Sequence, residues 1–373
     1  MAVLACVAGG IARTSTAEKT LSTARACAPL TPAVPGVTEG QSQAGTVGPP
    51  RGTLRAALLL VQPADTPPDD SVAPPETLLD GAAEWFRSVS YGRLQFEVET
   101  VPRWLPLPRT SVQYLEDPEA YLRDAVAAAD PFLDFSKIDV VYLSPASRTP
   151  ETRTSAVLYG FGVHADGREI RLWVPWQAGF AAQENTDSYA LIHETGHLLG
   201  LPDLYSQGAS STFHRWDVMA ARWPSELLAW HRWKLGWLDP GQIVCLARMR
   251  RRTVTLAPVE RPGGVKAVFV KRGTRVLAIE ARARLGYDRT LCDTGVLVYE
   301  VEQAQFKRAP IRVHQAKRDA VSPPRRDCAA KWNAPFEIGR GEVRKYRLTS
   351  FGVSLELLAR RPDGSYRIRI RPA

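Results

Sequence analysis

The sequence predicts an α+β protein with two folded units, and two observations carry this prediction. Segments with strand and helix periodicity alternate over residues 53–240, whereas short β-type runs separated by turns fill residues 241–373. Of the 373 residues, 45% are hydrophobic and 23% are charged, which is ordinary for a globular protein. At this length we expect two domains, preceded by a leader remnant or flexible N-terminal arm at residues 1–52.

The first unit should alternate strands and helices. The apolar run at 54–61 predicts a buried strand, and the alternation at 94–98 predicts a half-buried one. Asp117 can cap a helix that has Pro118 at its first position, where proline is well tolerated. The expected elements, in chain order, are strand 54–61, helix 76–89, strand 94–98, helix 117–129, and strands 138–143 and 170–174.

The second unit should consist of strands. Its β-type runs recur at turn-separated intervals, a spacing that predicts a β-sandwich-like module over residues 241–373. The runs lie at 253–256, 267–270, 276–281, 296–301, 353–358 and 366–370.

One segment of the first unit combines helix signals with metal-ligand spacing. Residues 193–203 read His-Glu-Thr-Gly-His-Leu-Leu-Gly-Leu-Pro-Asp. On a helix, His193 and His197 leave the same face about one turn apart. Gly200 can adopt the left-handed conformation that turns the chain back and brings Asp203 to the same ion. Three protein ligands with an open fourth position are typical of a catalytic zinc site.

The alternative is a buried helix that carries two hydrogen-bonded histidines. The added Gly and Asp lower the chance frequency of the motif by roughly two orders of magnitude, which favours the metal site. Asp187 or Ser188 can cap the start of the helix. Glu194 follows the first ligand and can reach a water bound to the metal.

This motif and its neighbours resemble the M6 family of metallopeptidases, the immune inhibitor A-like enzymes, within the metzincin group. The segments that carry the resemblance are Trp85–Gly92, His193–Tyr205, Trp216–Met219 and Lys234–Trp237, with weaker similarity at Gly286–Asp288 and Gly295–Tyr299. The resemblance implies a metzincin-like zinc-protease domain, with a mixed sheet and helices, followed by the β-sandwich-like module. It also implies that the strand at 170–174 lies at the edge of the cleft, where an extended substrate could pair with it; an ordinary paired strand is the alternative.

The resemblance implies a role for each motif residue. His193, His197 and Asp203 become the zinc ligands, and Glu194 becomes the general base. Met219 becomes the methionine of the turn beneath the metal, because an unbranched apolar side chain can form the floor of the site. The alternative is that Met219 is an ordinary core methionine. Zinc would lower the pKa of its bound water towards about 7 and polarise the scissile carbonyl, while Glu194 moves the proton to the leaving amine.

One position departs from the pattern of the group. Some metzincins have a tyrosine two residues beyond the methionine as a donor to the transition state, whereas this chain has Ala221. Tyr205, Arg222 and His231 are the candidates for this role, and each also has a structural explanation. The donor therefore stays unassigned at the level of the sequence.

The N-terminal segment and the cysteines suit export. Residues 1–12 are apolar without a preceding Lys or Arg, so they are either the tail of a signal peptide or a non-functional extension. We expect the first, and therefore an extracellular, secreted protein. If Cys6 is removed, the remaining cysteines can form two disulfides, for which we expect Cys292–Cys328 and Cys27–Cys245; free buried thiols are the alternative. Residues 28–52, rich in Pro, Gly, Ser and Thr, predict a linker or the tail of a leader.

Charge and composition limit the partners. The net charge is +9, and its densest run, Arg248–Arg252, has no interleaved aromatics or known module, so we expect a solvated face and no nucleic-acid partner. The sequence contains no run of about 18 apolar residues, so we expect no transmembrane helix. We expect a monomer that acts on protein or peptide substrates. A structural Ca²⁺ ion stays open as a second cofactor, but no Asp/Asn-rich loop with EF-hand spacing gives it a place in the sequence.

Three functions fit the sequence. The first is a secreted zinc endopeptidase. The second is a zinc amidase that acts on a non-protein substrate, which a closed pocket rather than an open groove would favour. The third is a non-catalytic binding protein with a vestigial site, against which the intact Glu194 argues.

Overall fold

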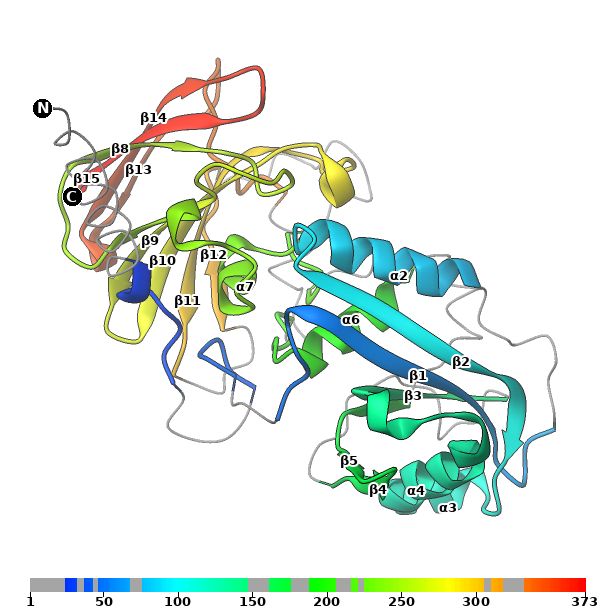
Figure 1. Ribbon diagram of the computed structural model, residues 1–373. Coiled ribbons are helices and arrows are strands. Elements are labelled where there is room, and N and C mark those ends of the chain that lie inside the picture. The colour runs from blue at the N-terminus through cyan, green and yellow to red at the C-terminus, as the bar shows by residue number, and fades with distance from the viewer. Residues whose placement is uncertain are drawn as a thin grey trace, which may run out of the picture.

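A computed structural model gives the protein an α+β structure, as the sequence predicts, and its described residues form two lobes (Figure 1). The sheet lobe spans residues 52–205, and the sandwich lobe spans residues 243–373. The structure describes residues 24–31, 37–42, 46–67, 76–146, 161–175, 188–205, 216–220, 225–304, 310–317 and 332–373.

The sheet lobe is organised around a four-stranded sheet in the order β2-β1-β3-β6. Its strands are β1 Gly52–Gln62, β2 Leu94–Pro106, β3 Val140–Pro145 and β6 Trp173–Pro175. All pairings of these strands are parallel, so the expectation of a mixed sheet is wrong for the described residues. The helices that connect β1 to β2 and β2 to β3 return the chain to the same end of the sheet, which makes neighbouring strands parallel.

Helices cover both faces of this sheet. Helices α2 Glu76–Val89 and α6 Tyr189–Leu198 lie on one face, and α3 Ser111–Glu116 and α4 Pro118–Ala129 lie on the other (Figure 1). Strand β1 alternates between them: Leu58 belongs to the core cluster shared with α2 and α6, whereas Leu59 packs with α4. Helix α2 has the predicted bounds. Asp117 caps α4 as predicted, because its carboxylate accepts a hydrogen bond from the Ala120 N–H at 3.0 Å.

The strand expected at 170–174 is divided in the structure. Ile170 ends β5 Arg168–Ile170, which forms a hairpin with β4 Val163–Ala165, and Trp173 begins β6. Strand β6 ends the strand order of the main sheet, and Trp173 and Val174 are buried. Pairing of a substrate with this strand stays a prediction.

The sandwich lobe contains a five-stranded sheet, β12-β11-β10-β9-β7, and a four-stranded sheet, β13-β14-β15-β8. Apolar side chains from both sheets, such as Ile279 and Ile368, form one core cluster. All six expected strands are present. The three others, β7, β12 and β13, have only three or four residues each, too few for a recognisable alternation. The strands are β7 Ile243–Leu246, β8 Arg252–Leu256, β9 Ala267–Arg272, β10 Arg275–Arg282, β11 Gly295–Glu302, β12 Ile311–Val313, β13 Lys345–Leu348, β14 Val353–Arg360 and β15 Tyr366–Pro372.

Short 3-10 helices punctuate both lobes. They lie at Asp130–Phe132, Phe135–Lys137, Pro240–Gln242, Gly286–Asp288 and Thr349–Phe351. Among the described residues, no helix is both long enough and apolar enough to cross a membrane.

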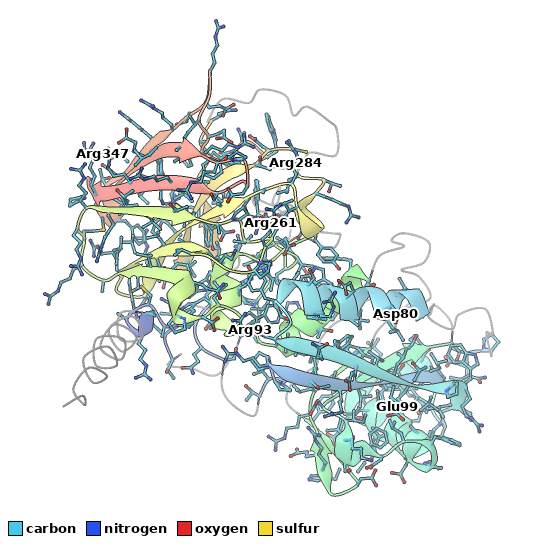
Figure 2. The ribbon with its side chains drawn as sticks, turned by 45° about the horizontal axis from the view of Figure 1, so that its top comes forward. Asp80, Arg93, Glu99, Arg261, Arg284 and Arg347 are labelled. Atoms are coloured by element: carbon cyan, nitrogen blue, oxygen red, sulfur yellow. A yellow bond between two sulfur atoms is a disulfide. The ribbon has the colours of Figure 1, made fainter. Side chains whose placement is uncertain are left out.

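The two lobes share a core. The largest cluster of buried side chains contains Trp85 of α2, Trp230 of α7 (Ala229–Lys234), and Phe269 and Tyr299 of the sandwich lobe. At the junction, Arg93, which is labelled in Figure 2, forms an ion pair with Asp239 at 2.5 Å. Figure 2 labels three basic residues on the sandwich lobe and two acidic residues on the sheet lobe: Arg261, Arg284, Arg347, Asp80 and Glu99.

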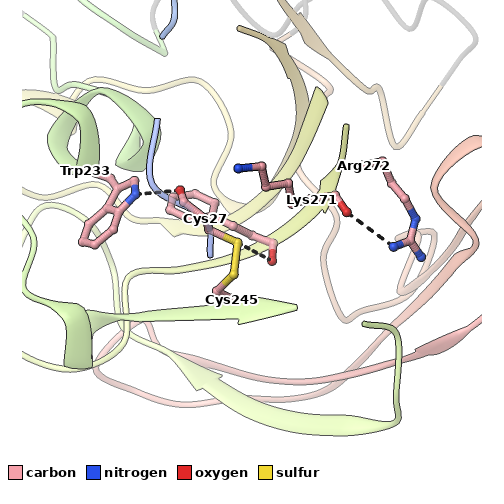
Figure 3. Close-up of a disulfide and its surroundings, with 6 residues drawn as sticks. Cys27, Trp233, Cys245, Lys271 and Arg272 are labelled. Carbon is pink, nitrogen blue, oxygen red and sulfur yellow. Dashed lines mark hydrogen bonds between the residues drawn. A yellow bond between two sulfur atoms is a disulfide. The ribbon is translucent and has the colours of Figure 1, made fainter. Parts of the chain in front are cut away.

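An N-terminal arm, which we define as the described residues 24–31, 37–42 and 46–50, packs against both lobes. Cys27 forms the expected disulfide with Cys245 of β7 (Figure 3). Cys292 is disulfide-bonded as well, and its expected partner, Cys328, lies outside the described residues. Cys27 and Glu39 are fully buried, so the expectation of a flexible arm or linker is wrong for this part of the chain, which belongs to the packed interior. Residues 1–23 lie outside the described part of the chain.

Candidate metal centre

Helix α6 carries the histidine motif and has the predicted geometry. His193 and His197 lie one turn apart, and their ring centroids are 4.8 Å from each other. The start of the helix differs from the prediction. Ser188 takes the cap position, but its hydroxyl donates to the Leu78 carbonyl of α2 at 2.5 Å and does not cap the helix. Asp187, the other predicted cap, lies outside the described residues.

The end of α6 turns the chain back as predicted. Gly200 has φ +90°, and the Leu201 N–H donates to the Gly196 carbonyl at 2.9 Å, which closes the last turn. A Cβ at Gly200 would also lie 2.1 Å from the Ser42 hydroxyl of the arm. Both the backbone conformation and the close approach of the arm therefore require glycine here.

The turn brings Asp203 to the two histidines. Asp203 Oδ1 lies 3.2 Å from His193 Nε2 and 3.3 Å from His197 Nε2. Of the described residues, these three form the group whose ligand atoms all lie within 4.8 Å of one another. Two imidazole nitrogens and a carboxylate oxygen thus converge on one point, as the sequence predicts.

Backbone carbonyls hold the histidine rings in one tautomer. His193 Nδ1 lies 3.1 Å from the Val218 carbonyl, and His197 Nδ1 lies 2.8 Å from the Leu201 carbonyl. A carbonyl oxygen only accepts, so each Nδ1 carries the proton and each Nε2 keeps its lone pair. In both rings the nitrogen that faces Asp203 is therefore the one able to bind a metal.

The three groups also attract one another electrostatically. Burial acts to raise the pKa of Asp203, but the imidazoles of His193 and His197 beside the carboxylate outweigh it and hold the pKa well below its usual range. Burial opposes charge on His197, but Asp203 and the nearby charge of Glu194 outweigh it and raise the pKa of this imidazole. The site thus holds a fixed carboxylate next to two metal-binding nitrogens, a donor set that suits Zn²⁺.

Exposure differs across the centre. The side chain of His193 is 5% exposed and that of His197 is 16% exposed, whereas that of Asp203 is 42% exposed. Glu194, next to His193 on α6, is buried. The centre is therefore accessible on the side of Asp203 and closed on the side of the helix.

Met219 lies beneath the helix, in the turn segment 216–220. It is fully buried, and a Cβ built at Gly196 would lie 2.5 Å from its sulfur. Its carbonyl accepts a hydrogen bond from the N–H of Leu204, the neighbour of Asp203, at 3.1 Å. Met219 thus contacts both the helix that carries the histidines and the segment that carries Asp203.

The three candidate transition-state donors have different positions. Tyr205 is 38% exposed, and its ring stacks at 6.0 Å from the His193 ring, so it lies at the centre. Arg222 lies outside the described residues. His231 is fully buried with both ring nitrogens engaged by Asp217 and Glu39, so it presents no group to a substrate.

Two residues of the site were missed in the sequence. The Tyr189 hydroxyl lies 3.3 Å from His193 Nδ1. Its place four residues before His193 was the signal that could have found it. Thr195 bonds the Tyr142 hydroxyl of β3 at 2.6 Å and so fixes α6 on the sheet. This second contact joins residues 53 apart, and no local pattern indicates it.

Comparison of the sequence with models of known protein families and with curated proteins gave no match.

Proposed function

We propose that this protein is a zinc-dependent metalloendopeptidase, in which His193, His197 and Asp203 bind the metal and Glu194 is the general base. One observation carries the proposal. Both Nε2 atoms meet Asp203 within 3.3 Å while both Nδ1 atoms are held by carbonyls, beside a buried glutamate. A helix with two histidines would be stable without the convergence of both Nε2 atoms on Asp203 and without the carbonyl contacts at both Nδ1 atoms.

The donor set argues for zinc. Imidazole nitrogens suit Zn²⁺, whereas Ca²⁺ takes oxygen ligands almost exclusively. Three protein donors with access from the side of Asp203 leave room for a fourth ligand, as in catalytic rather than structural zinc sites. The likeness of the motif to the M6 family, and with it the metzincin-type assignment, belongs to this proposal.

The residues divide the work of hydrolysis. When bound, zinc supplies a Lewis acid that polarises the scissile carbonyl and lowers the pKa of water. Glu194, as a carboxylate, accepts a proton from the attacking water, whose oxygen forms the new bond to the carbonyl carbon. Glu194 then gives that proton to the amine nitrogen as the C–N bond breaks. Tyr205 is exposed beside the His193 ring, so it is the described candidate for a hydrogen-bond donor to the carbonyl oxygen.

Secretion and a protein substrate are part of the same proposal. The Cys27–Cys245 disulfide and the disulfide-bonded Cys292 support an oxidising compartment. The partly exposed side chain of Asp203 supports access of a substrate to the centre, and the protein substrate follows from the likeness of the motif to the M6 family.

The test combines metal content with proteolysis. We expect the purified protein to contain one zinc ion and to degrade casein, and a chelator to remove both properties. Glu194→Ala should keep its zinc, because this residue is not a ligand, but should lose activity by about 10²- to 10⁴-fold. Glu119→Ala, on the exposed surface of α4, is the matched control and should keep full activity. Equal casein cleavage by wild type and Glu194→Ala would overturn the proposal.

A further inference from the structure

The arm is fastened to the sandwich lobe. Cys27 is covalently bound to Cys245, and its carbonyl accepts a hydrogen bond from Trp233 Nε1 of α7 at 2.9 Å (Figure 3). Further along the arm, the Leu30 N–H donates to the side chain of Gln303 at 2.8 Å. These contacts fix where the next residues of the arm enter the interior.

Glu39 is the charged residue that the arm buries. Its carboxylate is fully enclosed and accepts a hydrogen bond from Trp230 Nε1 at 3.1 Å. It also pairs with His231 Nε2 at 3.2 Å, on the same helix α7. A buried carboxylate is costly unless it is paired, so this position is specific to a residue that meets both donors.

His231 connects Glu39 to the turn segment, because its other ring nitrogen bonds Asp217. Its Nδ1 donates to Asp217 Oδ2 at 2.8 Å. Asp217 in turn accepts from the Met219 N–H at 2.9 Å and from the Leu228 N–H at 2.8 Å. The side chain of Asp217 therefore sets the conformation of the turn that contains Val218 and Met219.

That turn touches both parts of the metal centre. The Val218 carbonyl accepts from His193 Nδ1, and the Met219 carbonyl accepts from the N–H next to Asp203. The Met219 sulfur abuts α6 at Gly196. A continuous set of buried contacts thus runs from Glu39 through His231 and Asp217 to the residues that orient the ligands.

A second connection reaches the end of α6. Lys234 Nζ donates to the Thr38 carbonyl of the arm and to the Gly200 carbonyl at 2.5 Å. The Gly48 N–H, also in the arm, donates to the Leu198 carbonyl at 2.8 Å. The arm therefore contacts the C-terminal end of α6 directly, and it reaches the turn segment through His231.

We propose that the arm is a permanent part of the working protein and that Glu39 is a positioning residue for the metal centre, acting through His231 and Asp217. This inference rests on the proposed function only in taking His193, His197 and Asp203 as the ligands. According to this inference, residues 37–42 stay in the mature protein, even where a leader upstream of them is removed.

The test measures zinc affinity, not only activity. Glu39→Ala leaves the buried His231 imidazolium and the Trp230 N–H without their acceptor, and should weaken zinc binding about tenfold, at the lower end of the effect of outer-sphere partners. Glu39→Gln keeps an acceptor but not the charge, and its affinity should lie between those of Glu39→Ala and wild type. Competition with a chelator gives the dissociation constants, and the visible spectrum of the Co²⁺ form reports the ligand geometry.

Glu337→Ala is the matched control. Glu337 is also a buried glutamate, paired with Arg360 and Tyr366 in the sandwich lobe, but its described contacts do not include the turn segment. Its loss should lower the melting temperature and leave the zinc affinity and the Co²⁺ spectrum unchanged. A purely structural role for Glu39 would instead give the two variants the same behaviour and overturn the proposal.

A double variant tests the route. If Glu39 acts through His231, then Glu39→Ala with His231→Gln should bind zinc no more weakly than the poorer single variant. Additive losses would overturn the route through His231. Should Glu39→Ala not fold, Glu39→Gln decides: a zinc affinity within about twofold of wild type overturns the proposal. A wild-type protein that binds no zinc would instead contradict the proposed function itself.

Discussion

Arg282 of the sandwich lobe donates a hydrogen bond to the carbonyl of Trp216, in the turn beneath the candidate metal centre. Arg282 is fully buried and also donates to the Leu227 carbonyl at 3.1 Å. Asp288 and Glu280 balance its charge at 3.1 and 3.2 Å. The sandwich lobe thus supplies a buried cation to the turn segment, which the arm reaches through His231.

Loss of this cation should be costly. We expect Arg282→Met to lower the free energy of unfolding by about 3–5 kcal/mol, because Asp288 and Glu280 would stay buried without their partner. Arg123→Met removes an exposed pair with Glu119 and should cost no more than about 0.5 kcal/mol. Urea unfolding of both variants measures the difference, and similar values for the two would show that the buried cluster contributes little.

The contact between Gly196 and Met219 should be sensitive to one methyl group. Gly196→Ala would bring a Cβ to 2.5 Å from the Met219 sulfur, so the turn or the helix must shift. We expect a loss of about 1–3 kcal/mol in stability together with weaker zinc binding. Gly241→Ala has open space at its Cβ and serves as the control. Unchanged zinc affinity in Gly196→Ala would mean that Met219 does not support the ligands.

The disulfide of the arm should stabilise the fold through the length of the loop that it closes. Cys27 and Cys245 are separated by 218 residues. Loop closure of that length gives about 5 kcal/mol at most. The double variant Cys27→Ser, Cys245→Ser should therefore unfold at much lower urea concentration than wild type. A change below about 1 kcal/mol would show that the other contacts of the arm suffice.

The buried imidazole of His231 predicts a dependence of stability on pH. Burial alone would lower its pKa, but the charges of Asp217 and Glu39 outweigh burial and raise the pKa from 6.5 to about 10. Because the folded pKa lies above the unfolded one, the stabilisation is complete below pH 6.5 and is lost as the pH rises towards 10.

The measurement compares wild type with His231→Gln. Their difference in free energy of unfolding should shrink by about 1.4 kcal/mol per pH unit across this window. Lys234, whose pKa burial lowers to about 8, acts in the opposite sense, but it is present in both proteins and cancels in the difference. A difference that stays constant from pH 6.5 to 10 would mean that His231 is not charged in the folded state.

The sequence predicts well what is local. The spacing of His193 and His197, the left-handed Gly200 and the return to Asp203 lie within eleven residues, and the structure brings them together. The cap at Asp117 and the six strands of the sandwich lobe likewise follow from short patterns.

What the sequence could not predict depends on contacts between distant segments. Glu39 meets Trp230 and His231 across separations of 191 and 192 residues, and no periodicity indicates such pairs. The predicted cap at Ser188 failed for the same reason, because the Leu78 carbonyl of another helix engages its hydroxyl. The mixed sheet was expected from resemblance, whereas the observed strand directions follow from the crossover connections.

The Cys27–Cys245 bond also closes a covalent ring around the whole sheet lobe and the centre within it. A single backbone cut anywhere inside that ring releases neither piece. Such a molecule would migrate as one chain until it is reduced, and two fragments would then separate. If the proposed protease cleaved its own backbone once within this ring, the disulfide would keep both fragments of the chain together.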